Sequence, residues 1–108
     1  MLEITEYNFD EEITQCKAKV FLVFSSARCS FCRDLKQLTA VLQRVLTDVK
    51  FCFADVDKER GLAARFGINR LPVSIVFENG KEEARREGAM TKAEVFDVLK
   101  IKPETVRR

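Results

Sequence analysis

The sequence of 108 residues lacks histidine and tryptophan altogether and has only four cysteines, four glycines and two prolines. Without histidine, the chain cannot form a Cys-His or Ser-His nucleophile pair, an imidazole general base or a histidine-containing zinc site. Four cysteines are too few for the disulfide framework of a small secreted scaffold. The composition also lies outside the disordered and collagen-like classes. We therefore expect a globular protein whose thiols serve chemistry or the packing of the core.

No charge of one sign and no long apolar run dominates the chain. Its 19 basic and 17 acidic residues leave a net charge of +2, which gives no reason to expect nucleic acid as a partner. The first six residues are acidic where a secretory signal would be basic. The most apolar run, residues 20–24, is far shorter than the roughly 20 residues that cross a bilayer. We expect one cytoplasmic domain over residues 1–108, monomeric and without a membrane partner, with residues 102–108 as a frayed tail.

The changing period of the apolar residues predicts an α/β fold with the element order βαβαβαββα. Residues 19–25 form an unbroken apolar run, which is typical of a strand covered on both faces. Asn79 and Gly80 favour a tight hairpin between the last two strands. Strands separated by helices are expected to be parallel, and the hairpin adds an antiparallel edge. The predicted strands are residues 2–6, 19–25, 50–56, 73–77 and 82–86.

Four helices are predicted from capping residues and from apolar residues three or four positions apart. Asn8 and Glu11 resemble a capping box that opens a short helix ending at residue 15. Asp57 is expected to cap another short helix that ends at residue 65, before Gly67, and Thr91 to start the last helix. One long helix follows the second strand, because a single apolar stripe continues there at helical spacing. That stripe runs from Phe31 through Leu35, Leu38, Leu42, Val45, Leu46 and Val49, and the last helix has Val95, Val98, Leu99 and Ile101.

The motif Cys29-Ser30-Phe31-Cys32 lies where the long helix begins. A cysteine at a helix start meets unpaired backbone N–H groups and the positive end of the helix dipole, which favour the thiolate. The second sulfur lies about one turn further along and can close a disulfide with the first. Arg28 adds a positive charge beside the motif, either as a thiolate stabiliser or as a merely solvated charge. Such a pair can attack a disulfide and then resolve the mixed disulfide internally.

Two other interpretations of the motif are a zinc site and a pair of inert core thiols. Zinc would need two further ligands from Cys16, Cys52 or carboxylates, and none of these has a second paired spacing. We expect Cys52, in the middle of a strand, to fill the core, and Cys16, at the end of the first helix, to be partly exposed and open to a regulatory role. The redox interpretation is preferred. It requires no metal and no organic cofactor.

From about residue 2 to residue 100 the chain resembles the thioredoxin family, whose motif is Trp-Cys-Gly-Pro-Cys. The resemblance implies a central five-stranded mixed sheet flanked by four helices. It implies that Cys29 is the exposed attacking cysteine and Cys32 the buried resolving one. It also implies a cis Leu71-Pro72 bond, with Pro72 facing the dithiol and presenting backbone to an extended substrate, and a role for Gly88 in letting that substrate approach.

The chain departs from the family pattern around the dithiol. Val23 stands where the family has a buried aspartate associated with proton transfer to the resolving cysteine, and Phe53 where it has the partner lysine. Without that aspartate, we expect Cys32 to lose its proton to water or to the departing thiolate. Resolution is therefore expected to be slower or more dependent on pH than in the family. Loss of both charges together leaves no orphan charge.

The surface around the motif also differs from the family pattern. Ser25 and Arg28 stand at tryptophan positions, and Ser30 and Phe31 replace the glycine and proline between the cysteines, which should shift the redox potential. Phe31 is expected either to project into a substrate groove or to be a half-buried residue of the helix start. Substrate contacts are assigned to Arg28, Phe31, Leu71, Pro72 and Gly88.

The function expected from the sequence is thiol-disulfide exchange. The chain would reduce protein disulfides through Cys29 and Cys32 and would need an electron-donating reductase. The alternative is a thioredoxin-like module that binds a partner protein and has weak redox turnover or none.

Overall fold

The computed structural model describes residues 1–103, so residues 104–108 of the expected tail lie outside the described part. Within it, the predicted order βαβαβαββα is confirmed, with a short π-helix as the first helix. The elements are β1 (Leu2–Glu3), η1 (Asp10–Thr14), β2 (Lys19–Ser25), α1 (Ser30–Leu42), β3 (Val49–Asp55), α2 (Arg60–Arg65), β4 (Val73–Glu78), β5 (Lys81–Glu87) and α3 (Lys92–Leu99).

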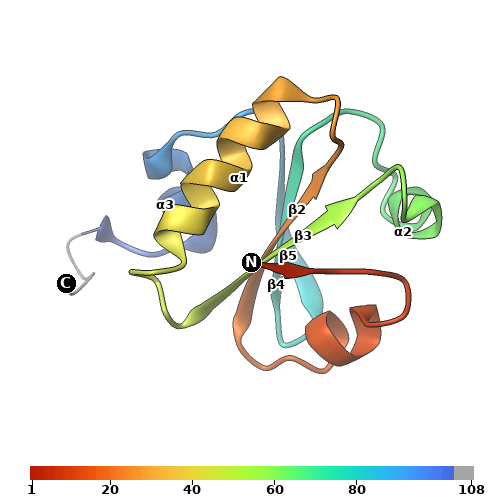
Figure 1. Cartoon of the computed structure of the whole chain (residues 1–108). Helices are drawn as coiled ribbons and strands as arrows, with labels where there is room; N and C mark the ends of the chain where they lie inside the picture. Colours follow the sequence, from red (N-terminus) through yellow and green to blue (C-terminus); the bar gives the residue numbers. More distant parts are fainter. Residues whose placement is uncertain (104–108) are drawn as a thin grey trace.

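The strands form one mixed sheet in the order β1-β3-β2-β4-β5 (Figure 1). β1, β3 and β2 are parallel, and β4 is antiparallel to both β2 and β5. The predicted mixed sheet with an antiparallel hairpin at one edge is therefore confirmed. β2 lies at the centre, and six of its seven residues are buried, as expected for its unbroken apolar run.

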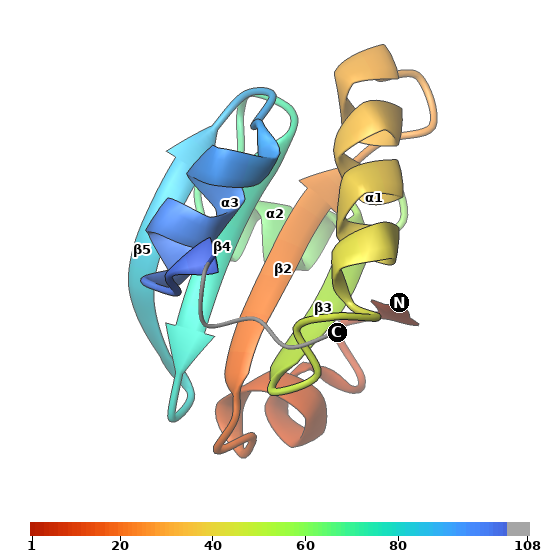
Figure 2. The same ribbon diagram turned by 90° about the vertical axis from the view of Figure 1, so that its left-hand side faces the viewer.

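The two faces of the sheet carry separate cores. α1 and α3 lie over one face, and α2 lies behind the sheet in the same view (Figure 2). Alternate residues of β2 serve the two cores: Phe21 and Val23 pack under α1 and α3, whereas Leu22 and Phe24 pack with Phe9 of the N-terminal segment. Among the described residues, no helix is long and apolar enough to span a membrane.

The capping box predicted at Asn8 is wrong. The Asn8 side chain accepts a hydrogen bond from the Thr5 N–H (2.7 Å), and the Thr5 hydroxyl oxygen accepts one from the Asn8 N–H (3.2 Å). η1 follows with Phe9 as its N-cap and no side-chain cap. The same pair shortens the first strand, because the Thr5 N–H turns to Asn8 after Ile4 has donated to the Phe53 carbonyl (2.7 Å).

The long apolar stripe crosses three elements and not one helix. α1 ends at Leu42, and the N–H groups of Arg44 and Val45 then donate to carbonyls three residues back, which tightens the chain into a turn. Leu46 is buried in that turn, and Val49 is buried in β3. The apolar residues continue beyond α1 because the turn and β3 contribute Leu46 and Val49 to the same core on which α1 packs.

The cap predicted at Asp57 is also wrong. α2 begins after Glu59, without a side-chain cap, and the Asp57 carboxylate instead accepts a hydrogen bond from the Ser26 hydroxyl (2.7 Å). The other boundary residues behave as predicted. Thr91 forms a full capping box with Glu94, and Asn79 and Gly80 take positive φ angles of 53° and 78° in the hairpin turn.

Candidate active site

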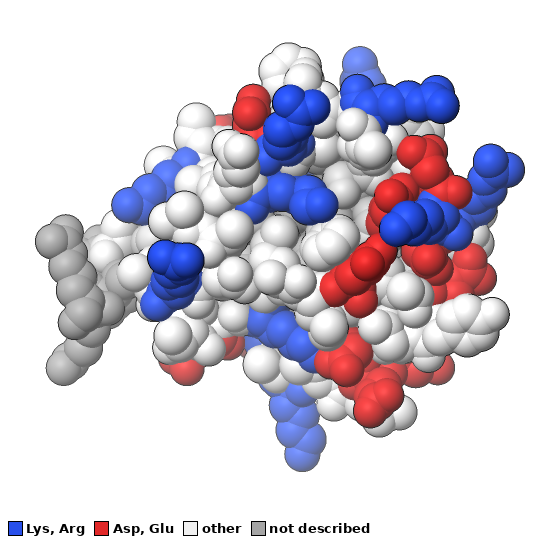
Figure 3. All heavy atoms as spheres, viewed as in Figure 1, with Lys and Arg blue, Asp and Glu red and all other residues white. Residues whose placement is uncertain are grey.

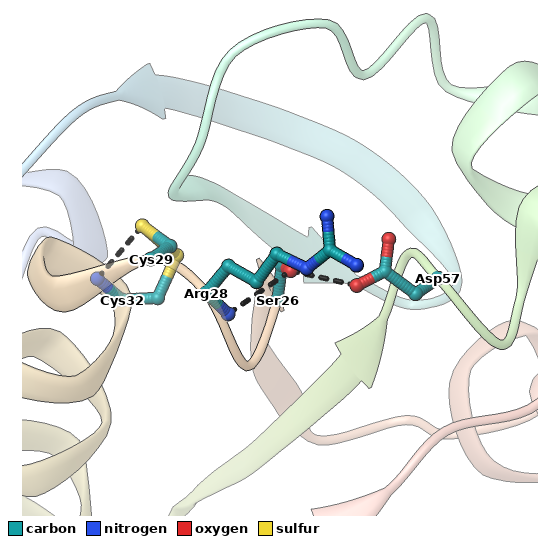
Figure 4. The surroundings of a disulfide bond; sticks show 5 residues. All are labelled: Ser26, Arg28, Cys29, Cys32 and Asp57. Carbon is teal, nitrogen blue, oxygen red and sulfur yellow. Dashed lines mark hydrogen bonds between the residues drawn. A yellow bond between two sulfur atoms is a disulfide. The ribbon is translucent and has the colours of Figure 1, made fainter.

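The two cysteines of the motif lie at the start of α1, next to the end of β2. Cys29 is the N-cap of α1, and its sulfur accepts a hydrogen bond from the Cys32 N–H (3.1 Å). The two residues form a disulfide with a Cα–Cα separation of 5.2 Å (Figure 4). Cys29 is half-buried, whereas Cys32 is only 1% exposed. The cap position places the Cys29 sulfur among unpaired N–H groups, which favours its thiolate when the bond is reduced.

The loop between β2 and α1 is hydrogen-bonded to the segment that follows β3. The Ser26 hydroxyl donates to Asp57, and its oxygen accepts from the Arg28 N–H (3.3 Å). The Arg28 side chain is exposed and extends away from the two sulfurs toward Asp57 (Figure 4). The backbone of Arg28 therefore helps to position the motif, while its guanidinium points away from the dithiol.

A groove of about 360 Å³ lies beside the motif and contains three of the predicted substrate residues. Its lining residues are Phe31, Arg70, Leu71, Glu87, Gly88 and Ala89. The Leu71-Pro72 bond is cis, as expected. The Gly88 N–H donates to the Pro72 carbonyl (2.7 Å), and Gly88 takes a φ of 90° that few other residues adopt.

Sequence reasoning missed the two charged residues of this groove. Arg70 and Glu87 are exposed and precede Leu71 and Gly88 in the chain. Their position next to two predicted substrate residues was the available signal. They make the groove polar as well as apolar, which fits an extended peptide backbone.

A second cavity, of about 520 Å³, opens on another side of the dithiol. Its lining includes Cys29, Cys32, Ser25, Lys36 and Asp55. In the sequence no carboxylate stands in place of the family's buried aspartate, whereas in the structure Asp55 lines the same cavity as Cys32. Asp55 lies 23 positions further along the chain, at the end of β3, and a sequence alone gives no sign that this strand end faces the motif.

The two apolar replacements at the family's charged positions are neighbours in the sheet. Val23 of β2 and Phe53 of β3 are in register, and Val23 is fully buried. The Lys36 ammonium group lies 3.9 Å from the centre of the Phe53 ring, a cation-π distance. A lysine from α1 therefore covers the aromatic ring at this position.

The remaining cysteines lie on the other face of the sheet. Cys52 is fully buried in the core, as predicted, and burial raises the pKa of its thiol to about 12. Cys16 is a half-buried free thiol that packs against the same core. Within residues 1–103, no three Cys, Asp or Glu side chains come together as metal ligands would.

Comparison with known proteins adds independent evidence. The sequence model of the family "Thioredoxin" matches residues 1–101. A thioredoxin of Mycoplasma genitalium is 33% identical over 89 residues, covering 82% of this chain and 87% of that protein. Bloodstream-specific protein 2 of Trypanosoma brucei brucei is 32% identical over 101 residues, covering 92% of this chain and 20% of that protein. A thioredoxin of Pseudomonas aeruginosa is 22% identical over 103 residues, covering 92% and 93%.

Proposed function

The chain belongs to the thioredoxin family, and on this premise we propose that it reduces protein disulfides with Cys29 as the attacking and Cys32 as the resolving cysteine. It is a thiol-disulfide oxidoreductase with a close cysteine pair. The alternative of a redox-silent binding module is not favoured by its relatives. The unequal exposure of the two cysteine residues supports the assignment of roles, because a protein substrate can reach a half-buried Cys29 but not a Cys32 that is 1% exposed.

The reaction transfers two electrons from the dithiol to the substrate. The Cys29 thiolate attacks one sulfur of the substrate disulfide, a mixed disulfide forms, and the other substrate sulfur leaves as a thiolate. The Cys32 thiolate then attacks the Cys29 sulfur, which releases the second substrate thiolate and closes the Cys29-Cys32 disulfide. A reductase returns two electrons and two protons to the protein.

Substrate contacts are proposed for the groove beside the motif. Phe31, Leu71 and Gly88 line it, and the buried Pro72 holds its carbonyl against the Gly88 N–H. An extended segment next to the substrate disulfide would lie along this groove. Arg28 is exposed at the edge of the motif and is proposed to contact the substrate from there.

The family implies protein substrates and a reductase in general. We further propose that residues 1–108 form a single domain that acts as a monomer in the cytoplasm, without nucleic acid, metal or organic cofactor. Gel filtration with light scattering tests the monomer, and a dimer in both redox states would contradict it.

The reduction of insulin by dithiothreitol tests the function directly. The wild-type protein should accelerate precipitation of the insulin chains, and Cys29→Ser should abolish the acceleration. Cys32→Ser should instead trap the mixed disulfide, visible by mass spectrometry. An inactive wild-type protein with a reducible Cys29-Cys32 bond would support the binding module. The midpoint potential of the pair against glutathione then decides whether the protein reduces or oxidises its partners.

A further inference from the structure

The resolving thiol must lose its proton before it can act. Only the thiolate attacks a disulfide at a useful rate. Cys32 is 1% exposed, so bulk solvent barely reaches it directly, and Val23, which stands at the family's buried aspartate position, is apolar and fully buried. The structure must therefore contain some other route for the proton.

The 520 Å³ cavity beside the dithiol provides such a route. It touches Cys32 at one side and reaches solvent past the exposed residues Ala27, Arg33 and Gln37. A volume of this size admits several water molecules. Among the described residues that line it, Asp55 is the one carboxylate.

The register of the sheet places Asp55 on the correct face. Asp55 and Ser25 are partners at the ends of β3 and β2. Two residues earlier, Phe53 and Val23 are partners and pack on the core under α1. Because side chains alternate along a strand, Ser25 and Asp55 face the same side, toward the start of α1 and Cys32. The small Ser25 also lines the cavity.

We propose that Asp55 accepts, through water in this cavity, the proton that Cys32 releases when it resolves the mixed disulfide. This inference rests on the proposed function. In the step, the Cys32 S–H bond breaks, a water passes its proton to the Asp55 carboxylate, and the Cys32 thiolate attacks the Cys29 sulfur. The substrate sulfur leaves with the bonding electron pair. Protonated Asp55 then returns its proton to solvent, so that charge and protons balance.

Basic side chains line the same cavity as Asp55. They are Arg33 and Lys36 of α1, and the N-terminal residue Met1 also borders the cavity. The Asp57 N–H donates to Asp55 Oδ1 (2.9 Å), which orients the carboxylate. On the face shown in Figure 3, basic side chains lie over α1, and acidic ones gather over η1 and α2.

A two-step reaction with an aromatic disulfide isolates the resolution step. When the reduced protein meets dithiobis(nitrobenzoate), attack by Cys29 releases one coloured thiolate and resolution by Cys32 releases a second. A Cys16→Ser background removes the half-buried free thiol from the signal. Cys29→Ser should remove the first release and Cys32→Ser the second only. Failure of that pattern would reject the proposed roles, independently of Asp55.

Asp55→Asn should slow the second release about tenfold at neutral pH and leave the first unchanged. This is less than the roughly 10²–10⁴-fold effect of direct general base catalysis, because water intervenes. In Asp55→Asn, the rate of the second release should then keep rising with pH toward the ordinary thiol pKa of about 8.5. Asp34→Asn, which removes an exposed carboxylate of α1 that does not line the cavity, is the matched control. Ser25→Trp, which fills the cavity without changing a charge, should slow the second release as well.

A second carboxylate should make Asp55 dispensable. In a Val23→Asp background, Asp55→Asn should cause no further slowing, since the new carboxylate stands at the position where the family has its buried aspartate. If Asp55→Asn and Asp34→Asn give the same rate and pH profile for the second release, the proposal is overturned. Slowing by Ser25→Trp alone would also reject Asp55 and would identify plain solvent access as the route.

Discussion

Val23 and Ser74 lie directly opposite each other on β2 and β4, and the Ser74 hydroxyl, in a residue 1% exposed, has no hydrogen-bond partner among the described residues. A buried hydroxyl without a partner costs about 1–3 kcal/mol. In the described part of the chain, the core beside Val23 therefore contains a polar group without a polar partner. This pair makes the replacement of the buried charges testable by stability as well as by rate.

Ser74→Ala should leave the free energy of unfolding unchanged or raise it by about 1 kcal/mol, because it removes an unpaired hydroxyl. Thr39→Val is the matched control, since Thr39 is equally buried but its hydroxyl donates to the Leu35 carbonyl (3.0 Å). That variant should lose about 1 kcal/mol. Urea unfolding of the oxidised proteins measures both. Equal losses in the two variants would mean that Ser74 is paired in solution.

Val23→Asp should lower the free energy of unfolding by about 3 kcal/mol, because it places a carboxylate at a fully buried position. Its partners on the two neighbouring strands are the Ser74 hydroxyl and the ring of Phe53, which stands where the family has a lysine. In the folded protein it should speed resolution at neutral pH. Urea unfolding gives the stability, and the second thiolate release gives the rate. Adding Ser74→Ala should deepen the loss, and a double variant no less stable than Val23→Asp would contradict the pairing.

Cys52 should make the free energy of unfolding depend on pH in the alkaline range. Burial raises the pKa of its folded thiol to about 12 from 9.0, so above pH 9 the unfolded state loses this proton first. Its contribution is complete below pH 9 and is lost as the pH rises toward 12. The oxidised wild-type protein should therefore destabilise more steeply over this range than Cys52→Ala. Parallel stability curves would show that Cys52 ionises in the folded state.

Phe31→Ala should lower kcat/KM for insulin several-fold and barely change the first thiolate release from the small aromatic disulfide. Phe31 is 59% exposed and lines the groove proposed for substrate, so a protein loses buried contact area that a small reagent does not use. Val41→Ala, an equally exposed apolar residue elsewhere on α1, is the control. Equal losses with both substrates would place Phe31 in the chemistry of the motif instead.

The elements of the fold were predictable where a local rule decides them. Thr91 and Asn79-Gly80 mark their boundaries because a cap and a tight turn involve residues that are adjacent in sequence. Asn8 and Asp57 were wrongly predicted to cap helices, because each side chain had two possible hydrogen-bond partners. Asn8 accepts from the Thr5 N–H and Asp57 from the Ser26 hydroxyl, and neither accepts from the N–H groups of a helix start.

By itself, the sequence determined the order of elements and the dithiol at the start of a helix, because apolar period, turn residues and the CxxC spacing are properties of short segments. The cis Leu71-Pro72 bond was implied by the family resemblance. Tertiary structure alone decided what surrounds the dithiol. The register of β2 and β3 brings Asp55 into the cavity that Cys32 lines, and α1 carries Lys36 over Phe53. Such neighbours are fixed by strand pairing and helix packing across long stretches of chain, which no short pattern encodes.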